Sequence, residues 1–274
     1  MALWLAGPAL VLVVHLAAIG AEPWKRMVLL VLALFLWMKA VVQVEAARRG
    51  TRLGAGDRLA FVLAWPGMRP RAFARRSPNS LPGARAILSR GVVRIAAGGA
   101  LIALSHALVA AGGSRALATA PLLVGMSLLL HFGIFRLATA LWRSRGRDVR
   151  ELFRDPLRSR SLAEFWSRRW NVAFSEMVQE TVYPLAVGRC GPALATGAGF
   201  LFSGLLHEAA ITLPVRTGFG GPTLYFLLQW LGTLIERRLG PLGRIATLAW
   251  IAAPLPLLCP ASFIREVCWR IGGL

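Results

Sequence analysis

Long apolar runs, separated by short polar segments, recur along almost the whole chain. A helix that crosses a bilayer needs about 20 mostly apolar residues, because hydrocarbon offers no partner for unpaired backbone N–H and C=O groups. The pattern predicts an all-α, polytopic transmembrane bundle of about seven to nine helices, some of them interfacial. The candidate spans are Leu3–Ile19, Met27–Val44, Ile87–Ala111, Leu117–Trp142, Pro192–Leu213, Thr223–Ile235 and Ile245–Leu258.

Two shorter apolar stretches, Leu59–Trp65 and Val182–Val187, cannot cross a bilayer. They are expected to lie at the interface or to re-enter the membrane. The first run, Leu3–Ile19, lacks a basic lead-in, so a retained helix is expected rather than a cleaved signal peptide, although Ile19-Gly20-Ala21 loosely resembles a cleavage site.

No linker rich in Ser, Gly or Pro separates the apolar runs. We therefore expect a single domain over 1–274, with N-terminal helices in 1–142 and a motif-bearing part in 150–236. Neither an internal repeat nor a heptad pattern is visible.

Composition and charge agree with a membrane protein. The 274 residues are 56% hydrophobic and 16% charged, whereas soluble domains carry about 25% charge. The net charge of +20 would suggest nucleic acid in a soluble protein, but here the arginines gather between apolar runs, and no nucleic-acid partner is expected. Such basic loops favour anionic lipid head groups and a polyanionic substrate such as a phosphate-rich acyl carrier.

The position of the arginines also predicts an orientation. Basic segments follow the second and fourth runs, at 48–85 and 143–160, and short basic loops stay in the cytoplasm. The N-terminus of this integral, multi-pass protein is then cytoplasmic. The three cysteines have no Cys-x-x-Cys spacing and no nearby histidine pair, so we expect neither a disulfide framework nor a metal site.

A first motif lies in the polar stretch after the fourth run and reads Ser-Leu-x-x-Phe-Trp-x-x-Arg-Trp-Asn over 161–171. Ser161 and Glu164 have the spacing of a capping box, which opens a helix. On a continuous helix Trp166 and Trp170 share one face, extended by Ala173 and Met177. We expect this helix to lie along the membrane surface with its aromatic face toward the lipid.

A second motif, Phe-Ser-Gly-x-x-His-Glu over 202–208, sits inside an apolar run. A charged group near the centre of a spanning helix costs on the order of 2 to 3 kcal/mol, so the pair His207 and Glu208 requires a reason. A neutral imidazole in a chamber of low dielectric can accept a proton from a hydroxyl group. Ser203 and Gly204 lie one turn earlier and leave space beside His207.

The two motifs, with Thr181-Val182-Tyr183-Pro184 between them, resemble the membrane-bound O-acyltransferases and, within that family, the wax synthase branch. The resemblance covers roughly residues 150–236. It implies helices around an intramembrane chamber that acyl-CoA enters from the cytoplasm and a lipophilic alcohol enters from the bilayer. It also implies that His207 acts as general base while Asn171 orients substrate or stabilises the oxyanion, with acyl-CoA as co-substrate and no cofactor.

Further residues near the motifs are candidates for substrate binding. Arginines next to the motif, including Arg158, could grip the phosphates of CoA, and the aromatic side chains could pack against the acyl chain or pantetheine arm. The candidate set is Trp166, Arg168, Arg169, Trp170, Ser203 and Glu208. His15, His106 and His131 also lie in apolar helices but belong to no motif.

Other interpretations stay open at this point. His207 could make only an interhelical hydrogen bond, the tryptophans could be interfacial anchors, and the arginines could be ordinary loop charge. A transporter or channel, or a non-catalytic scaffold related to the acyltransferases, would also use such helices. Within the enzyme interpretation, a sterol, a diacylglycerol or a hydroxylated secondary metabolite could replace the fatty alcohol as acceptor.

Overall fold

Helices form all the regular structure in residues 2–274, the part of the chain that the computed structural model describes. The one extended contact there is an isolated β-bridge between Arg76 and Arg147. The predicted all-α class is therefore confirmed, and many of the large apolar side chains on the outer surface are exposed, as lipid contact requires.

Four continuous helical segments are long and apolar enough to cross a membrane, or five if one bent pair counts as a span. Two of the four contain a turn of π-helix or a kink. The four are α2 (Pro23–Arg48); α5 (Ala84–Ala110); α6 (Arg115–Ser127), η1 (Leu128–Ile134) and α7 (Phe135–Ser144) in series; and α10 (Val182–His207), η4 (Glu208–Thr212) and α11 (Leu213–Val215) in series.

The remaining predicted spans are helical but are not among these four segments. The first run forms α1 (Ala2–Ala17), which packs along α2, and Thr223–Ile235 lies within α12 (Gly221–Leu239). Ile245–Leu258 is the first arm of a broken segment whose halves meet at 75°. Its elements are α13 (Arg244–Ala252), α14 (Leu255–Leu258), α15 (Ala261–Phe263), η5 (Ile264–Cys268) and α16 (Trp269–Gly272).

The short stretch Val182–Val187 is the first part of α10 and not a separate element. Gly191, with φ 76° and ψ 171°, breaks the helix between this part and the predicted run that starts at Pro192. Proline cannot donate to the preceding turn, and it disfavours the helical conformation at the residue before it, so glycine with positive φ is suited to this kink.

The other short stretch, Leu59–Trp65, belongs to α3 (Ala55–Leu63), which is followed by α4 (Pro70–Ala74). Lys39 of α2 is fully buried and donates to the carbonyl oxygens of Phe61, Trp65 and Gly67 at 2.8, 2.6 and 2.5 Å. An ammonium group at the carboxyl end of a helix interacts favourably with the helix dipole. Lys39 therefore ties α3 and the following turn to a spanning helix.

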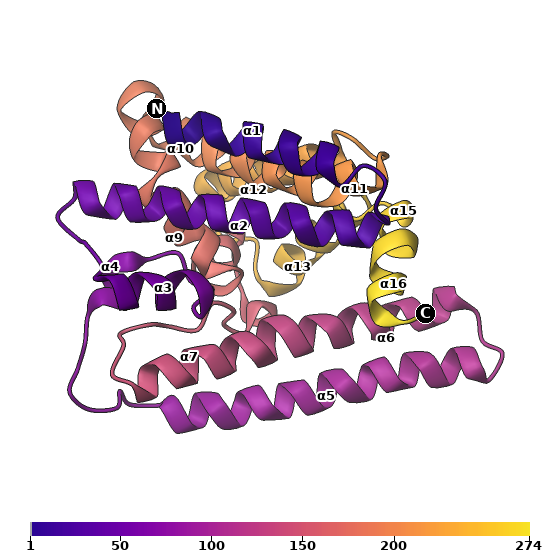
Figure 1. Ribbon diagram of the computed structural model, residues 1–274. Helices are drawn as coiled ribbons and strands as arrows, with labels where there is room; N and C mark the ends of the chain where they lie inside the picture. The colour runs from indigo at the N-terminus through magenta and orange to yellow at the C-terminus, as the bar shows by residue number, and fades with distance from the viewer. Residues whose placement is uncertain (1) are drawn as a thin grey trace.

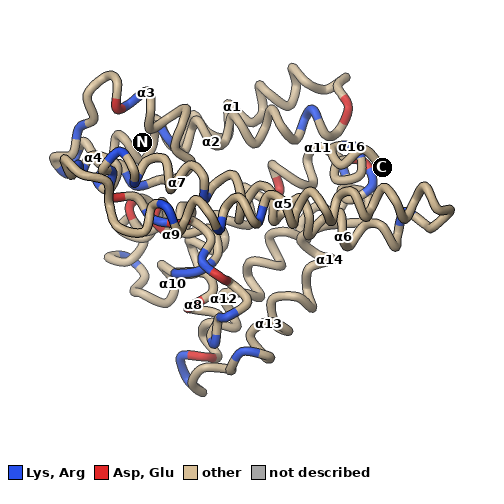
Figure 2. Tube along the Cα trace, turned by 90° about the horizontal axis from the view of Figure 1, so that it is seen from below, with Lys and Arg blue, Asp and Glu red and all other residues tan. Residues whose placement is uncertain are grey.

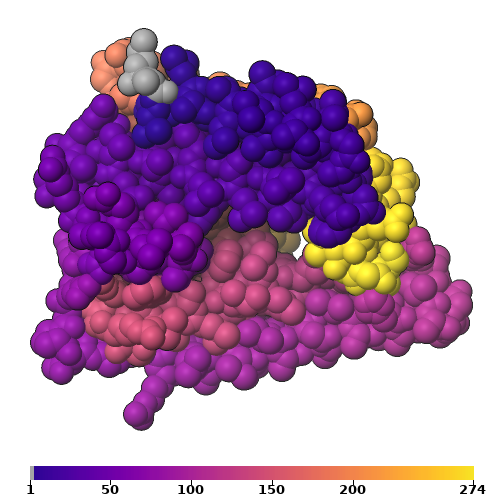
Figure 3. Space-filling view, viewed as in Figure 1, coloured from indigo at the N-terminus to yellow at the C-terminus, as the bar shows by residue number. Residues whose placement is uncertain are grey.

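The helices form two layers. In Figure 1, α5 runs beside α6 and α7 along one side, while α1, α2, α10 and α12 lie together on the other. A Cβ atom at Gly98 of α5 would lie 2.7 Å from the carbonyl oxygen of Gly125 of α6, so glycines allow this close crossing. The surface in Figure 3 is hollowed between the two layers.

The two basic loops meet at one end of the bundle. The N–H of Ser77 donates to the carbonyl oxygen of Gly146 at 2.8 Å, and Arg147 binds the carboxylate of Asp57. Charged residues gather around α3, α4, α8 and α9, whereas the far ends of α5 and α6 carry few (Figure 2). The loops thus share one side as expected, and the cytoplasmic N-terminus stays a prediction.

Candidate active site

The first motif begins with the predicted helix cap. The Ser161 hydroxyl accepts a hydrogen bond from the N–H of Glu164 at 3.0 Å and opens α8 (Leu162–Glu164). The return bond of the capping box goes one residue further back, because Glu164 Oε2 accepts from the N–H of Arg160 at 2.8 Å. This N–H and the Arg169 guanidinium hold the pKa of Glu164 below its ordinary value.

The prediction that one continuous helix places Trp166 and Trp170 on the same face is wrong. α8 passes into one π-helical segment, η3 (Phe165–Arg169), and the chain then becomes extended at Trp170, with φ −107° and ψ 126°. Asn171 adopts the left-handed conformation, with φ 43° and ψ 56°, which asparagine tolerates better than most residues. Its Oδ1 accepts from the N–H of Phe174 at 3.3 Å and caps α9 (Val172–Glu180), so the new helix starts there.

Helix α12 fixes the start of this motif through a buried carboxylate. Glu236 accepts hydrogen bonds from the N–H groups of Leu162 and Ala163 at 2.8 and 3.2 Å. A carboxylate at the amino end of a helix satisfies free N–H groups and interacts favourably with the helix dipole. Trp166 then packs edge-on against Phe200 of α10 and next to Phe226 of α12.

The imidazole of His207 is held at one nitrogen, and no described residue binds the other. His207 is the last residue of α10, and its Nδ1 lies 2.7 Å from the carbonyl oxygen of Ser203. A carbonyl oxygen can only accept a hydrogen bond, so Nδ1 carries the proton and Nε2 carries the lone pair. The ring lies against Phe226, with 4.5 Å between ring centroids.

Glu208, the neighbour of His207, points to a different partner. One carboxylate oxygen accepts from the N–H and the hydroxyl of Thr223 at 3.1 and 2.9 Å, and the other accepts from the Thr212 hydroxyl at 2.7 Å. Thr223 is in the first turn of α12. Glu208 therefore joins the α10 segment to the start of α12 beside His207.

A cavity of about 450 Å³ brings together most of the predicted site residues. Trp166, Trp170, Asn171, Ser203 and His207 all line it, although they come from η3, the turn before α9, and α10. The other lining residues are Ala163, Ser167, Phe174, Ser175, Val178, Gln179, Tyr183, Thr196, Gly199, Phe200, Phe226, Thr233 and Arg237.

Asn171 can donate into this cavity. Its Oδ1 is used by the cap of α9, and no described residue accepts a hydrogen bond from its Nδ2. The two N–H bonds of the amide are thus free for a substrate oxygen. Because a single side chain provides both the helix cap and these donors, its left-handed backbone is part of the site.

Several of the predicted substrate contacts lie outside this cavity. Glu208 does not line it, and Arg168 is exposed and lines none of the cavities described here. Arg169 binds Glu164 at 2.7 Å and lines a separate, basic cavity. The roles assigned to these three residues stay predictions.

Sequence reasoning missed the contribution of α12. Phe226 and Thr233 line the cavity, and Arg237 near the end of the helix is the one arginine in its lining. In the sequence α12 reads as an apolar run that ends in the Arg-Arg pair 237–238, which also fits ordinary positive-inside charge. Within residues 2–274 no group of three or more His, Cys, Asp or Glu residues is placed to hold a metal ion.

Comparison with known proteins gives matches over the segment that contains the two motifs. Residues 149–228 match the sequence profile of the membrane bound O-acyl transferase family. The predicted resemblance to this family is confirmed over these residues. A probable long-chain-alcohol O-fatty-acyltransferase 2 of Arabidopsis thaliana is 32% identical over 100 residues, which is 33% of this chain and 29% of that protein. The probable long-chain-alcohol O-fatty-acyltransferase 1 of the same plant is 33% identical over 101 residues, again 33% and 29%.

The chain thus covers less than a third of the length of these curated relatives. The matched segment begins just before the first motif and ends within α12, so it includes His207, Asn171 and most of the cavity lining. The helices before residue 149 lie outside the acyltransferase profile.

Proposed function

We propose that this membrane protein is an O-acyltransferase that moves a fatty acyl group from acyl-CoA to the hydroxyl of a lipophilic alcohol. The observation that carries the proposal is the shared cavity of His207 and Asn171, in which the contact of Nδ1 with the Ser203 carbonyl leaves Nε2 as the proton acceptor of a neutral imidazole. The names of the Arabidopsis relatives specify a long-chain alcohol, and we propose the same class of acceptor here.

The chemistry needs one proton acceptor and one oxyanion donor. As the alcohol oxygen attacks the thioester carbon, its O–H bond breaks and the proton passes to His207 Nε2. The Asn171 amide donates to the carbonyl oxygen while negative charge develops there. The C–S bond then breaks, His207 returns the proton to the leaving thiolate, and the products are an ester and free CoA.

The surroundings of His207 suit this exchange. The Ser203 carbonyl fixes the tautomer and the orientation of the ring, and it stabilises the imidazolium that forms when Nε2 takes the proton. Phe226, Phe200 and Phe174 give the cavity an apolar wall, which accommodates an aliphatic chain and keeps the local dielectric low.

The test is product identification with the full chain purified in phosphatidylcholine nanodiscs. Labelled palmitoyl-CoA is supplied with hexadecanol, a sterol or a diacylglycerol, and the lipid products are separated. We expect labelled wax ester and an equal release of CoA with hexadecanol. His106→Ala serves as the matched histidine control, because His106 binds the Gly272 carbonyl and lines none of the cavities described here.

We expect His106→Ala to retain the activity and His207→Ala to lose it. The proposal fails if folded wild-type protein forms no ester with any of these alcohols, or if His207→Ala forms it at the wild-type rate. Ester from the sterol or diacylglycerol alone would keep the reaction and correct the acceptor.

A further inference from the structure

A buried arginine without a partner lies at the end of the bundle opposite to the basic loops. Arg26 belongs to the first turn of α2 and is 7% exposed. Nε and Nη1 of its guanidinium group are buried, and neither has a hydrogen-bond partner among the described residues. A buried charge without a partner is strongly unfavourable, because it has lost its hydration and gained no contact in exchange. The position therefore requires an anion.

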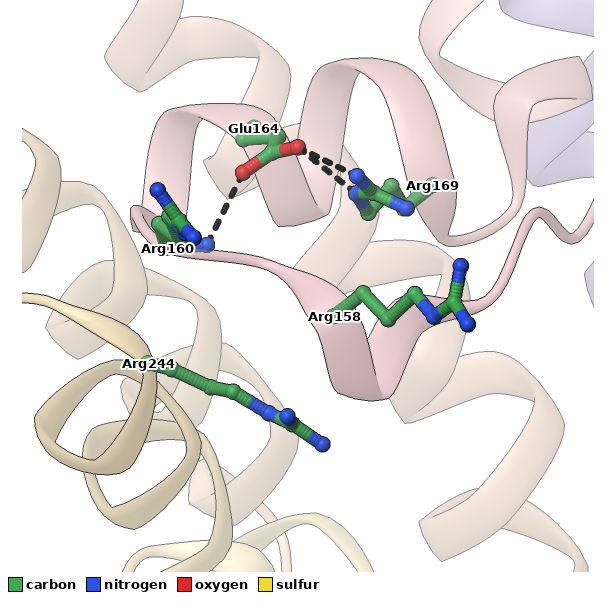
Figure 4. A pocket seen from close by; sticks show the side chains of 5 residues that line it. All are labelled: Arg158, Arg160, Glu164, Arg169 and Arg244. Carbon is green, nitrogen blue, oxygen red and sulfur yellow. Dashed lines mark hydrogen bonds and ion pairs between the residues drawn. The ribbon is translucent and has the colours of Figure 1, made fainter.

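Other arginines of low exposure in the described chain have a carboxylate partner. Arg136 binds Glu151 at 2.6 Å, and Arg147 binds a carboxylate of α3. Figure 4 shows the same arrangement nearer the surface, where Glu164 holds Arg169 at 2.7 Å. The guanidinium group in the first turn of α2 departs from this pattern.

Unused polar nitrogen atoms from two further helices lie close to Arg26. In Figure 1 this end of α2 lies beside α11, α15 and α16, whereas α3 and α4 lie at its other end. Arg216, which ends α11, and His15 of α1 are both close enough to Arg26 to interact electrostatically. Arg216 donates through Nη2 to the Ile19 carbonyl at 3.1 Å, and no described residue binds its other two nitrogens. Nδ1 of His15 is buried and also has no described partner.

Little negative charge offsets these cations. Glu266 of η5 is near enough for its charge to act on Arg26, but it is exposed and forms no ion pair with a described residue. Glu22, just before α2, is bound to Lys25 at 2.9 Å. The tendency of basic residues to gather in one set of loops does not explain Arg26, because those loops lie at the opposite end of the helix.

The surroundings of Arg26 suit the head-group level of a bilayer. Glu22 makes no side-chain cap, so the first N–H groups of α2 are not capped, and a helix start of this kind favours an anion. Trp24 lies in the same turn, as is typical at a membrane interface. Further along α2, Leu29 and Leu32 are exposed and can contact lipid chains.

We propose that Arg26, Arg216 and His15 bind the phosphate group of an anionic phospholipid, in the leaflet at this end of the bundle. Guanidinium groups bind phosphate through paired N–H donors, and the excess of cations here favours a lipid with net negative charge. A lipid bound in this way joins α11 to α2. None of the three residues lines the His207 cavity, so the site is separate from the proposed active site and does not depend on acyl transfer.

Binding is tested with the full chain, purified free of lipid in dodecyl maltoside and titrated with dioctanoyl phosphatidylglycerol. Loss of one hydrogen bond to a charged group weakens binding about 10-fold, so Arg26→Gln should lower the affinity by at least about this factor. Arg216→Gln, at an exposed position, should lower it in the same direction and keeps the test valid if Arg26→Gln does not fold. Lys25→Gln is the matched control, because Lys25 is exposed and already paired with Glu22. Its affinity should change by no more than about two-fold.

Thermal unfolding gives a second readout with a distinctive sign. Without lipid, Arg26→Gln should unfold at a temperature no lower than wild type, because it removes a buried charge that has no partner. Added dioctanoyl phosphatidylglycerol should raise the midpoint of wild type and leave that of Arg26→Gln unchanged.

Four results would overturn the assignment. Unchanged affinity in folded Arg26→Gln would exclude the site, and an equal loss in Lys25→Gln would show only general attraction to a basic surface. Equal affinity for dioctanoylglycerol, which lacks phosphate, would show that apolar contacts alone hold the lipid. Inorganic phosphate that displaces the lipid at the lipid's own concentration would identify a site for soluble phosphate. Failure of ester formation would leave all of these measurements unaffected, so the site and the proposed reaction are tested separately.

Discussion

Removing the Glu208 carboxylate should loosen the contact between α10 and α12 next to His207. The carboxylate accepts three hydrogen bonds, two from Thr223 and one from Thr212, at 2.7 to 3.1 Å. It also faces the first turn of α12, where a negative charge interacts favourably with the helix dipole. In Glu208→Ala the N–H of Thr223 loses its acceptor. In Glu208→Gln one amide oxygen can keep the two bonds from Thr223.

The expected cost follows from these bonds. A hydrogen bond to a charged group contributes about 1.5–3 kcal/mol, and the three share one carboxylate, so Glu208→Ala should lose about 3 kcal/mol of unfolding free energy. For Glu208→Gln we expect a loss of about 1 kcal/mol of unfolding free energy. At this chain size 1 kcal/mol corresponds to about 2–4 °C in thermal midpoint, so the alanine variant should unfold roughly 9 °C lower.

The assay is thermal unfolding in detergent at one scan rate, combined with ester formation at a temperature where each variant stays folded. Glu208→Gln should retain most of the activity, because His207 keeps its position. The reasoning is refuted if Glu208→Ala unfolds at the wild-type temperature yet loses acyl transfer 100-fold. That result would return Glu208 to the substrate-binding role predicted from its place in the motif.

Three further changes have defined outcomes. Asn171→Asp keeps the left-handed backbone and the cap of α9 but removes both amide donors, so the thermal midpoint should hold while the rate of ester formation falls about 100-fold. Gly204→Ala should lower the midpoint, because the new Cβ would lie 2.7 Å from the Thr223 Cα, whereas Gly188→Ala, with nothing within 4 Å, should not. Glu164→Gln should make the stability of the protein depend less on pH in acid. The pKa of Glu164 is lower in the folded protein than its ordinary value of 4.5, so the ionised carboxylate stabilises the fold above pH 4.5. This contribution is lost as the pH falls from 4.5 through the lower pKa of the folded state.

The spans could be predicted because membrane insertion leaves a strong one-dimensional pattern. Runs such as Ile87–Ala111 end within a few residues of the observed helix, since both ends are set by where apolar residues stop. The Ser161 cap was predictable for a similar reason, because it depends on residues three apart.

The break at Trp170 could not be predicted in this way. The helical spacing of Trp166 and Trp170 suggested one continuous face, but the left-handed conformation at Asn171 ends that helix and starts another. Backbone hydrogen bonds to an earlier part of the chain flank this residue: the N–H of Val172 donates to the Leu152 carbonyl at 2.9 Å, and the N–H of Arg154 donates to the Arg169 carbonyl at 2.8 Å. Local periodicity contains no information about such contacts.

The chemical groups of the site could be predicted from the sequence, but only part of the cavity lining could. His207 and Asn171 were chosen from their motifs, and the fold brings both to one cavity. The contribution of α12, from Phe226 to Arg237, depends on how α12 packs against α10. The basic cavity likewise combines Arg158 with Arg244, residues that only the folded chain brings together.

The central claim is that Nε2 of His207 accepts the proton of the attacking alcohol. The most direct test compares ester formation in a single turnover by wild type and by His207→Asn, whose amide can still donate to the Ser203 carbonyl as Nδ1 does but offers no base at the Nε2 position. With palmitoyl-CoA and hexadecanol both bound, the account predicts a rate at least about 100-fold lower in the folded variant. A rate close to that of wild type would contradict it.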